Sequence, residues 1–318
     1  MSHHPRLIKP STRRFFREAR RTPGYSLFDF LHAYVYGRWP YLYIGIGTGE
    51  HPLAKKLGPF VGWLARRFRR GTDGKPQPGA PQAAAGRSSL AETYHGKVVP
   101  LESAKHLVQV NEPIALPNLE HVIPYRQARD LILQNPDHIV ALECPCRASR
   151  PNPCLPLGVC LIIGEPFAGF VVEHQPRRAR WIAPAEAVAI LTAEDARGHV
   201  HHAFFKNAML HRFYAICNCC ACCCGAMQAR KNGTPMLASS GYVSRVDPDR
   251  CIGCGDCETY CQFDALSLSA GIAVVEAAAC MGCGVCTDKC DQGALSLVRD
   301  ESKGQPLEIR TLLATASR

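Results

Sequence analysis

The chain has 318 residues, which is enough for two or three domains and a sizeable core. None of its 18 cysteines precedes position 144, and most lie within a few residues of the next, a spacing that suits metal binding. Disulfide scaffolds are usually short secreted chains with dispersed cysteines, so we expect free thiols and a reducing, cytoplasmic location. The formal net charge is +10, and residues 1–70 alone hold 14 Lys/Arg against 3 acidic side chains, so an electrostatic partner is expected there.

Residues 1–70 form a basic segment that is rich in aromatic side chains. Arg13-Arg14 resembles the start of a twin-arginine export signal, but charged residues follow where an apolar run is needed. The aromatic stretch 25–49 is interrupted by charges and proline, so it predicts no membrane span. Over 52–70, apolar residues at helical spacing predict an amphipathic helix with Lys and Arg on its other faces.

This basic segment is expected to be a docking segment. A helix of that kind can lie on an anionic membrane surface or on a membrane-bound partner, and the protein would then be peripheral on the inner face of the membrane. A soluble protein partner is the alternative, and nucleic acid is the least favoured. A Gly/Pro/Ala/Gln-rich linker at 71–91 follows.

The rest of the chain predicts an α+β fold. A cysteine-rich domain at 92–240 is followed by a repeat-containing module at 241–300 and a tail at 301–318. In the first of these, periodicity predicts helices at 124–134 and 184–197 and strands at 139–142, 158–164, 170–173, 199–205 and 213–216. Gly198 is a plausible residue to end the second helix. Two cysteine groups then follow strand ends, where loops can present ligands.

Ten cysteines of the 92–240 domain form two groups. The first is looser, with Cys144, Cys146, Cys154 and Cys160, and the second is dense, with Cys217, Cys219, Cys220, Cys222, Cys223 and Cys224. Structural cores do not need ten clustered thiols. At least one further [4Fe–4S] cluster is the favoured interpretation, and a tetrahedral zinc site or free, redox-active thiols remain open. The histidines at 199, 201 and 202 lie on an expected strand and are not assigned as ligands.

The module at 241–300 contains an internal repeat. Cys251, Cys254, Cys257 and Cys261 recur as Cys280, Cys283, Cys286 and Cys290, with identical spacing. A cubane cluster presents four irons, each of which needs one thiolate, and three closely spaced cysteines on a glycine-rich loop can reach three of them. Zinc held by one Cys-x2-Cys pair from each run would leave the third and fourth cysteines of both runs without a role.

This repeat resembles the bacterial two-cluster ferredoxin family, in which the fourth cysteine of each run binds the other cluster. The resemblance implies two [4Fe–4S] clusters. Cluster 1 would be held by Cys251, Cys254, Cys257 and Cys290, and cluster 2 by Cys280, Cys283, Cys286 and Cys261. The family usually has proline after each fourth cysteine, whereas this chain has Gln262 and Asp291, which puts the reduction potentials in doubt.

A wider resemblance covers about residues 98–298. The combination of Cys-x-Cys-Arg at 144–147, Cys-Asn-Cys-Cys at 217–220 and the two-cluster module is similar to a loosely annotated family of prokaryotic ferredoxin-like proteins. That family implies an architecture and no substrate. Cys223-Cys224-Gly225 also resembles, over three residues, the CCG motif of heterodisulfide reductase subunits.

The sequence therefore predicts an electron-transfer protein that carries single electrons through [4Fe–4S] clusters to a redox protein partner. The alternative is an iron–sulfur oxidoreductase or activase with a catalytic cluster in the 92–240 domain, and no catalytic residue can be named for it. There is no glycine-rich dinucleotide fingerprint after a strand and no Walker loop, so no nucleotide cofactor is expected.

Overall fold

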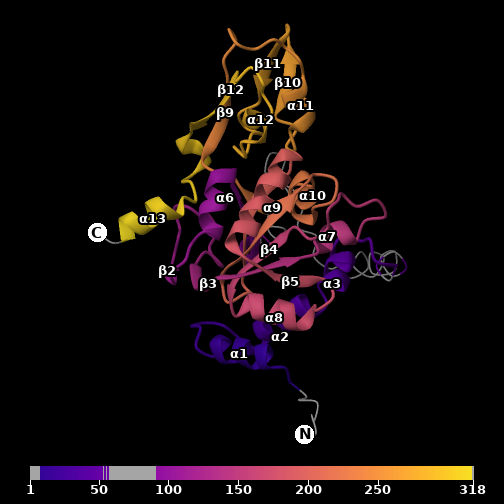
Figure 1. Cartoon of the computed structure of the whole chain (residues 1–318), viewed down its shortest axis with the longest axis vertical. Coiled ribbons are helices and arrows are strands. Elements are labelled where there is room, and N and C mark those ends of the chain that lie inside the picture. The colour runs from indigo at the N-terminus through magenta and orange to yellow at the C-terminus, as the bar shows by residue number, and fades with distance from the viewer. Residues whose placement is uncertain (1–7, 53, 55, 57–90, 317–318) are drawn as a thin grey trace, which may run out of the picture.

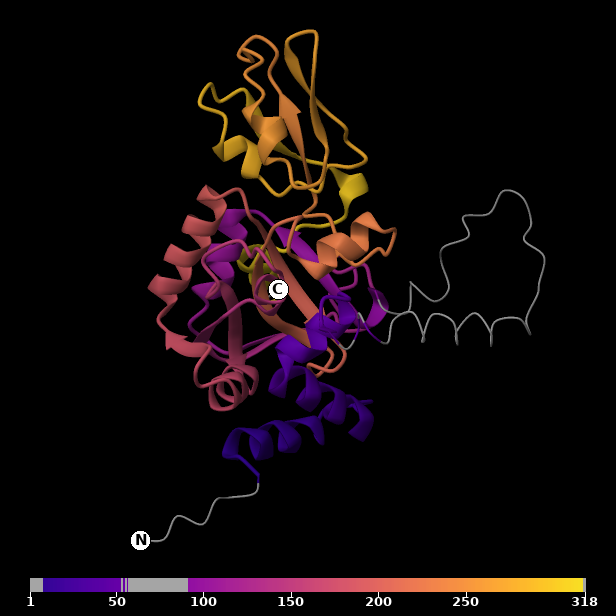
Figure 2. The ribbon, with the colours of Figure 1, turned by 90° about the vertical axis from the view of Figure 1, so that its right-hand side faces the viewer.

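The computed structural model describes residues 8–52, 54, 56 and 91–316. The expected amphipathic helix at 52–70 and the linker at 71–91 lie almost wholly outside these residues. No helix in the described part of the chain combines the length and apolar character needed to cross a bilayer. Figures 1 and 2 show three layers along the longest axis, with the N-terminal helices at one end and the C-terminal module at the other.

The fold is α+β and is organised around one eight-stranded sheet in the middle layer. Its order is β2-β3-β4-β7-β6-β1-β8, and β5 pairs with β3 beside that path. All these pairs are antiparallel except β1 with β8. The strands are β1 (Tyr94–Val99), β2 (Ile114–Leu116), β3 (Leu131–Leu142), β4 (Cys160–Glu165), β5 (Ala179–Ile182), β6 (Val200–Lys206), β7 (Arg212–Cys219) and β8 (Leu237–Ala238).

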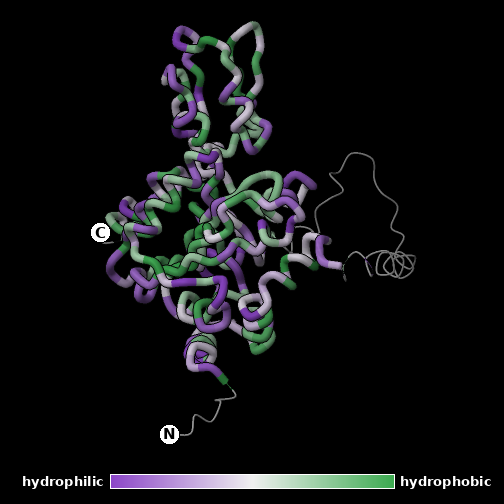
Figure 3. Tube along the Cα trace, turned by 45° about the vertical axis from the view of Figure 1, so that its right-hand side comes forward, coloured by the Kyte–Doolittle hydropathy of each residue, from purple (hydrophilic) through white to green (hydrophobic). Residues whose placement is uncertain are grey.

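Helices cover this sheet, so its central strands β1, β4, β6 and β7 are buried almost throughout. On one side, α6 (Leu101–Val108) packs with α9 (Pro184–Ala196), and α13 (Ile309–Ala316) packs onto α6. Elsewhere α8 (Phe167–His174) lies on β3 and β4. Two short helices, α7 (Pro145–Ala148) and α10 (Gly225–Lys231), follow the cysteine-bearing strand ends. Figure 3 shows the apolar residues gathered in the centre of this sheet domain.

The N-terminal helices are built into this domain. They are α1 (Pro10–Ala19), α2 (Leu27–Arg38) and α3 (Pro40–Gly47). Phe15 is fully buried and meets Phe30, Phe167 and Phe170 edge to face, with ring centroids 5.5–5.6 Å apart. Such aromatic pairs stabilise beyond the area they bury. Residues 8–52 therefore share the core of the sheet domain.

The C-terminal module repeats one unit twice. It contains β9 (Tyr242–Val246), α11 (Asp256–Tyr260), β10 (Leu266–Ser269), β11 (Ile272–Val275), α12 (Val285–Asp288) and β12 (Leu295–Arg299), followed by the 3-10 turn η1 (Glu301–Lys303). β10 pairs with β11, and β12 pairs with β9. The offset that carries the first cysteine run onto the second also carries α11 onto α12 and β10 onto β12.

Two sequence expectations about elements are wrong. The helix at 184–197 and the strands at 158–164 and 199–205 are confirmed within two residues, whereas those expected at 139–142 and 213–216 are parts of the longer β3 and β7. No helix forms at 124–134. Leu131 and Leu133, which are two residues apart, are both buried, and they pair with β2 as the start of β3. Residues 170–173 lie in α8 and not in a strand. Phe167, Phe170, Val171 and His174 are among its buried residues, at helical spacing, and a window of four residues was too short to show that period.

Candidate metal centres

The C-terminal module contains two small cavities, each lined by four thiols. Cys251, Cys254, Cys257 and Cys290 line one, and Cys261, Cys280, Cys283 and Cys286 line the other. Each fourth cysteine thus joins the three cysteines of the other run. Two left-handed glycines allow this fold: a Cβ on Gly253 would lie 2.2 Å from Gly271 O, and one on Gly282 would lie 2.2 Å from Tyr242 O.

Backbone N–H groups point at these sulfurs in matching pairs. Ala265 N lies 3.2 Å from Cys261 Sγ, and Ala294 N, at the same position of the second unit, lies 3.3 Å from Cys290 Sγ. Ser244 and Ala273 donate in the same way to Cys280 and Cys251, at 3.5 and 3.4 Å. Hydrogen bonds to the ligand sulfurs stabilise their negative charge and tune the potential of an iron–sulfur cluster. The donor sets therefore fit [4Fe–4S] clusters.

The two cavities differ in their surroundings. The one with Cys254 is at the outer end, where Cys254 is exposed and Ile252 is 68% exposed. The one with Cys283 lies on the side of the sheet domain, because Tyr260 and Met281 line it and also contact residues of that domain. The Ser244 hydroxyl lies 3.4 Å from Cys286 Sγ, whereas its repeat partner Ala273 has no hydroxyl.

Gln262, which replaces the proline usual in the ferredoxin family, bridges the two domains. Its side-chain oxygen accepts a 2.8 Å hydrogen bond from the backbone N–H of Ala221, between Cys220 and Cys222. Lys289 donates to Ala196 O at 2.6 Å across the same contact. Asp288 also faces this contact, and burial together with the neighbouring Asp195 raises its pKa. A proline at 262 could not make the first bond.

Six of the upstream thiols form a ring, in which four are buried and two, Cys146 and Cys217, are half-buried. Neighbours within hydrogen-bonding range run in the order Cys217, Cys160, Cys144, Cys146, Cys224 and Cys219. All six line one apolar cavity of about 70 Å³. The hydrogen bond with Cys146, together with burial, raises the pKa of the Cys144 thiol to about 12. Thiols in such a place give up their protons when a cation binds them, so the ring is suited to metal and not to free thiolates.

The other four upstream thiols form a second group closer to the surface, and two of them, Cys220 and Cys223, are buried and also line the cavity of the ring. The Sγ atoms of Cys154, Cys220, Cys222 and Cys223 all lie within 4.8 Å of one another. Cys154 comes from the loop between α7 and β4, and the other three come from the loop between β7 and α10. The ten upstream cysteines are thus brought together as six and four, and not as the two groups that follow each other along the chain.

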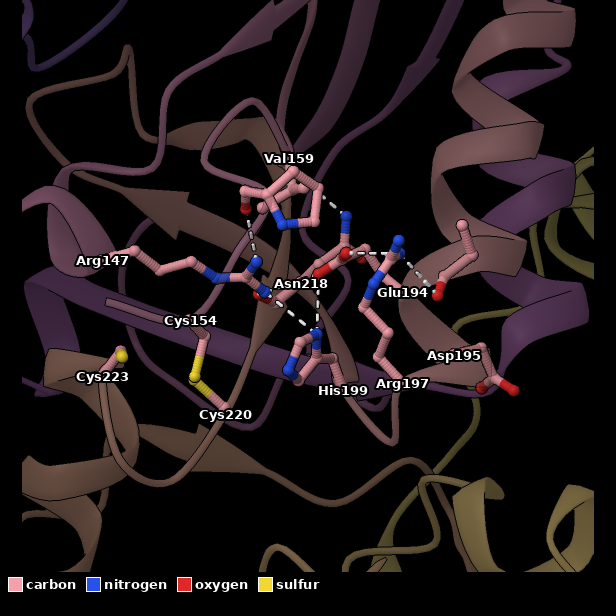
Figure 4. A network of polar contacts seen from close by, with 12 residues as sticks. Arg147, Cys154, Val159, Glu194, Asp195, Arg197, His199, Asn218, Cys220 and Cys223 are labelled. Carbon is pink, nitrogen blue, oxygen red and sulfur yellow. Dashed lines mark hydrogen bonds and ion pairs between the residues drawn. The ribbon is translucent and has the colours of Figure 1, made fainter. Parts of the chain in front are cut away.

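A buried charge network separates the thiol groups from α9. Arg147, which follows Cys146 directly, is only 1% exposed and contacts Glu194 at 2.5 Å and His199 Nδ1 at 3.1 Å. It also donates to the carbonyl of Asn218, whose side chain bonds His201. Figure 4 shows this network beside Cys154, Cys220 and Cys223. His199 and His201 thus serve as hydrogen-bonding partners in this network.

A larger cavity of about 650 Å³ adjoins the ring of six thiols. Ile44, Tyr94, Cys146 and Ala226 line both cavities. Lys206 lines the larger one, where its Nζ lies 4.0–4.9 Å from the ring centroids of Tyr36, Tyr43 and Tyr94. Burial lowers the pKa of Lys206 to about 7. The cavity is therefore lined by aromatic side chains and by Lys206, His32 and Asp29, next to thiols that can hold metal.

Sequence reasoning missed several of these residues. In the sequence, Arg147 and Gln262 stand out only as neighbours of the cysteine runs, and nothing local marks Ser244 or Lys206. Their roles arise from contacts between distant segments, which no spacing records. One local signal was available: Cys217 and Cys219 are two residues apart in β7, so they face the same side of the sheet, and Asn218 between them faces the other side.

Residues 244–267 match a family model described as a 4Fe-4S binding domain. The matched stretch holds the first run of four cysteines, Cys251 to Cys261. No curated protein matches the chain. The chain therefore contains a region similar to 4Fe-4S binding domains, and this match together with the clustered cysteines supports iron–sulfur binding and electron transfer.

Proposed function

We propose that the chain passes single electrons inward, from an exposed outer site in the module, through a second site, to the ring of six thiols in the sheet domain. The observation that carries this is the order of the thiol groups. The cavity of Cys254 faces solvent, the cavity of Cys283 faces the sheet domain, and Gln262, next to Cys261, touches the loop of Cys220. A [4Fe–4S] cluster, when bound, exchanges one electron at a time.

Two pairs of variants test the two sites in the module. Anaerobic protein is expected to hold at least about eight irons per chain, four for each cubane. Cys261→Ser and Cys283→Ser should alter the same EPR signal of the reduced protein, and Cys290→Ser and Cys254→Ser should alter the other one. The two pairs occupy equivalent positions of the repeat, so each serves as the matched control for the other. The crossed arrangement is wrong if Cys261→Ser reproduces the spectrum of Cys254→Ser.

A redox protein would dock at the outer end of the module. Ile252, Leu268 and Val274 are exposed there at 68%, 39% and 46%. Residues 241–300 contain nine acidic and four basic side chains, which favours a basic partner. With cytochrome c as a basic electron acceptor, Ile252→Ser should slow electron transfer several-fold, and the rate should fall as salt rises. Leu155→Ser, at another exposed apolar residue, is the control and should leave the rate unchanged.

The N-terminal helices are proposed to meet an anionic membrane surface. Large apolar side chains are exposed along α2 and α3, namely Leu27, Phe28, Leu31, Val35, Trp39, Leu42 and Ile46. The basic α1 lies beside them. Full-length protein should sediment with anionic vesicles at low salt, and Leu27→Glu with Leu31→Glu should abolish this. Ile252→Glu, at the opposite end, should not. Retention of full-length protein in the supernatant would exclude direct lipid binding.

A second candidate function is reduction or activation of a small molecule in the 650 Å³ cavity. It is favoured by the wall that this cavity shares with the thiol ring at Cys146. Cyanide is a suitable probe, because it binds iron that has an open position. It should change an EPR signal of the reduced protein. Gly47 lines the cavity from α3, and an added Cβ there meets no atom within 4 Å, so Gly47→Leu should narrow the cavity and block that change. Gly158→Leu, at a position with equal room for a Cβ outside this cavity, should not. An identical response to cyanide in Gly47→Leu would exclude this cavity as the route.

A further inference from the structure

The group of four upstream thiols near the surface has the size of a single-ion site. Cys154 Sγ lies 3.3 Å from Cys222 Sγ and 3.7 Å from Cys220 Sγ, and Cys222 Sγ lies 3.7 Å from Cys223 Sγ. A tetrahedral zinc ion with Zn–S bonds of about 2.3 Å sets its sulfurs about 3.8 Å apart. In a cubane each thiolate binds a different iron outside the core, so the four sulfurs lie farther apart.

The backbone around this group is already held in place. Arg150 donates to the carbonyl of Cys223 at 3.1 Å and is ion-paired with Glu50 at 2.6 Å. Gln228 donates to the carbonyl of Cys222 at 2.9 Å. Cys222 is exposed and Cys154 is half-buried, so an ion has a path in from solvent. Second-shell bonds of this kind fix the ligands before the ion arrives.

We propose that Cys154, Cys220, Cys222 and Cys223 bind one Zn²⁺ ion as a structural site, distinct from the iron–sulfur clusters of the chain. Four thiolates and no open position are the pattern of structural zinc, and zinc has no redox chemistry of its own. The ion would fasten two loops whose cysteines are 66 residues apart in the chain. One of these loops carries Ala221, the contact with Gln262 of the module.

Metal analysis of anaerobically purified protein tests this. The full chain should contain one zinc besides its iron. The double variant Cys154→Ser with Cys222→Ser should contain none, with its iron content unchanged. Cys254→Ser with Cys257→Ser is the matched control, because it should lose iron and keep the zinc. Zinc retained in the first variant would overturn the proposal, and so would loss of iron from it in place of zinc.

A second variant keeps the test informative if the double variant Cys154→Ser with Cys222→Ser fails to fold. Cys222→His keeps a zinc ligand at the exposed position, so it should retain the ion. In protein reloaded with Co²⁺, its visible spectrum should shift from that of four thiolates to that of three thiolates and one imidazole. An unshifted spectrum would exclude Cys222 as a ligand. If the control kept all its iron, the proposed function would fail and the zinc site would stand.

Discussion

At the scale of single residues, hydroxyl and amide groups near the thiols distinguish the two halves of the module. Ser244 donates its backbone N–H to Cys280 Sγ, and its hydroxyl lies 3.4 Å from Cys286 Sγ, where it accepts from the thiol and can donate to the thiolate. Its repeat partner Ala273 offers only the N–H, to Cys251 Sγ. Each hydrogen bond to a ligand sulfur favours the more negative, reduced state of a cluster. The site of Cys283, which is the inner site because it faces the sheet domain, should therefore have a higher reduction potential than the outer site of Cys254.

Ser244→Ala should therefore lower the potential of the inner site and leave the outer one unchanged, as measured by a redox titration followed by EPR. Ala273→Ser is the matched variant and should raise the potential of the outer site. A fall in both potentials in Ser244→Ala would show a general loss of packing and not the loss of one hydrogen bond.

At the scale of elements, the end of α9 positions the module. Gly198 follows the last turn with φ +81°, and its N–H and that of His199 bond back to Asp195 O and Glu194 O. This is the arrangement of a Schellman C-terminus, for which glycine is the usual residue. The absence of a side chain also leaves room for Tyr260 of the module, since a Cβ there would lie 2.7 Å from its ring.

Gly198→Ala should destabilise the protein by more than the roughly 1–2 kcal/mol that a left-handed alanine costs, because it also displaces Tyr260. Gly24→Ala is the control, with φ +70° and no atom near an added Cβ. Thermal unfolding gives the two losses, and proteolysis between the sheet domain and the module should accelerate only in Gly198→Ala. Equal losses in the two variants would show that Tyr260 moves aside freely.

At the scale of the whole molecule, buried neutral histidines make the fold sensitive to acid. His95 and His202 are fully buried, and burial lowers their pKa values to about 4 and about 3. For His202 the neighbouring His201 and Arg230 add to this effect. The unfolded chain binds these protons near pH 6.5, so stability should fall as pH drops below that value, by up to about 3 kcal/mol per pH unit.

His202→Leu should move the midpoint of acid unfolding to lower pH, because one such proton uptake is removed. Tryptophan fluorescence between pH 7 and 4 would follow the transition. The exposed His121→Leu is the control and should leave the midpoint unchanged. A midpoint for His202→Leu that equals that of the wild-type protein would mean that other groups dominate the acid transition.

The sequence was most informative where the structure is local. The module could be predicted because its cysteines lie within one repeat, and the end of α9 because Gly198 stands next to the helix it ends. Phe170 to Glu173 could not be placed, since a short apolar run suits a buried helix as well as a strand. The division of ten thiols into six and four was also out of reach, because it depends on Cys154 meeting a loop 66 residues away.

The repeat in the module also carries information about where the module is attached. Its two halves share cysteines and glycines, but they differ at Tyr260 against Lys289, at Gln262 against Asp291 and at Ser244 against Ala273. Tyr260, Gln262 and Lys289 each contact the sheet domain or lie at its edge, and Asp291 is exposed. The two units of the module have the same fold, but these differences give the module one end that faces the sheet domain and one that faces solvent. Comparing such a repeat with itself, position by position, locates an interface from one sequence alone.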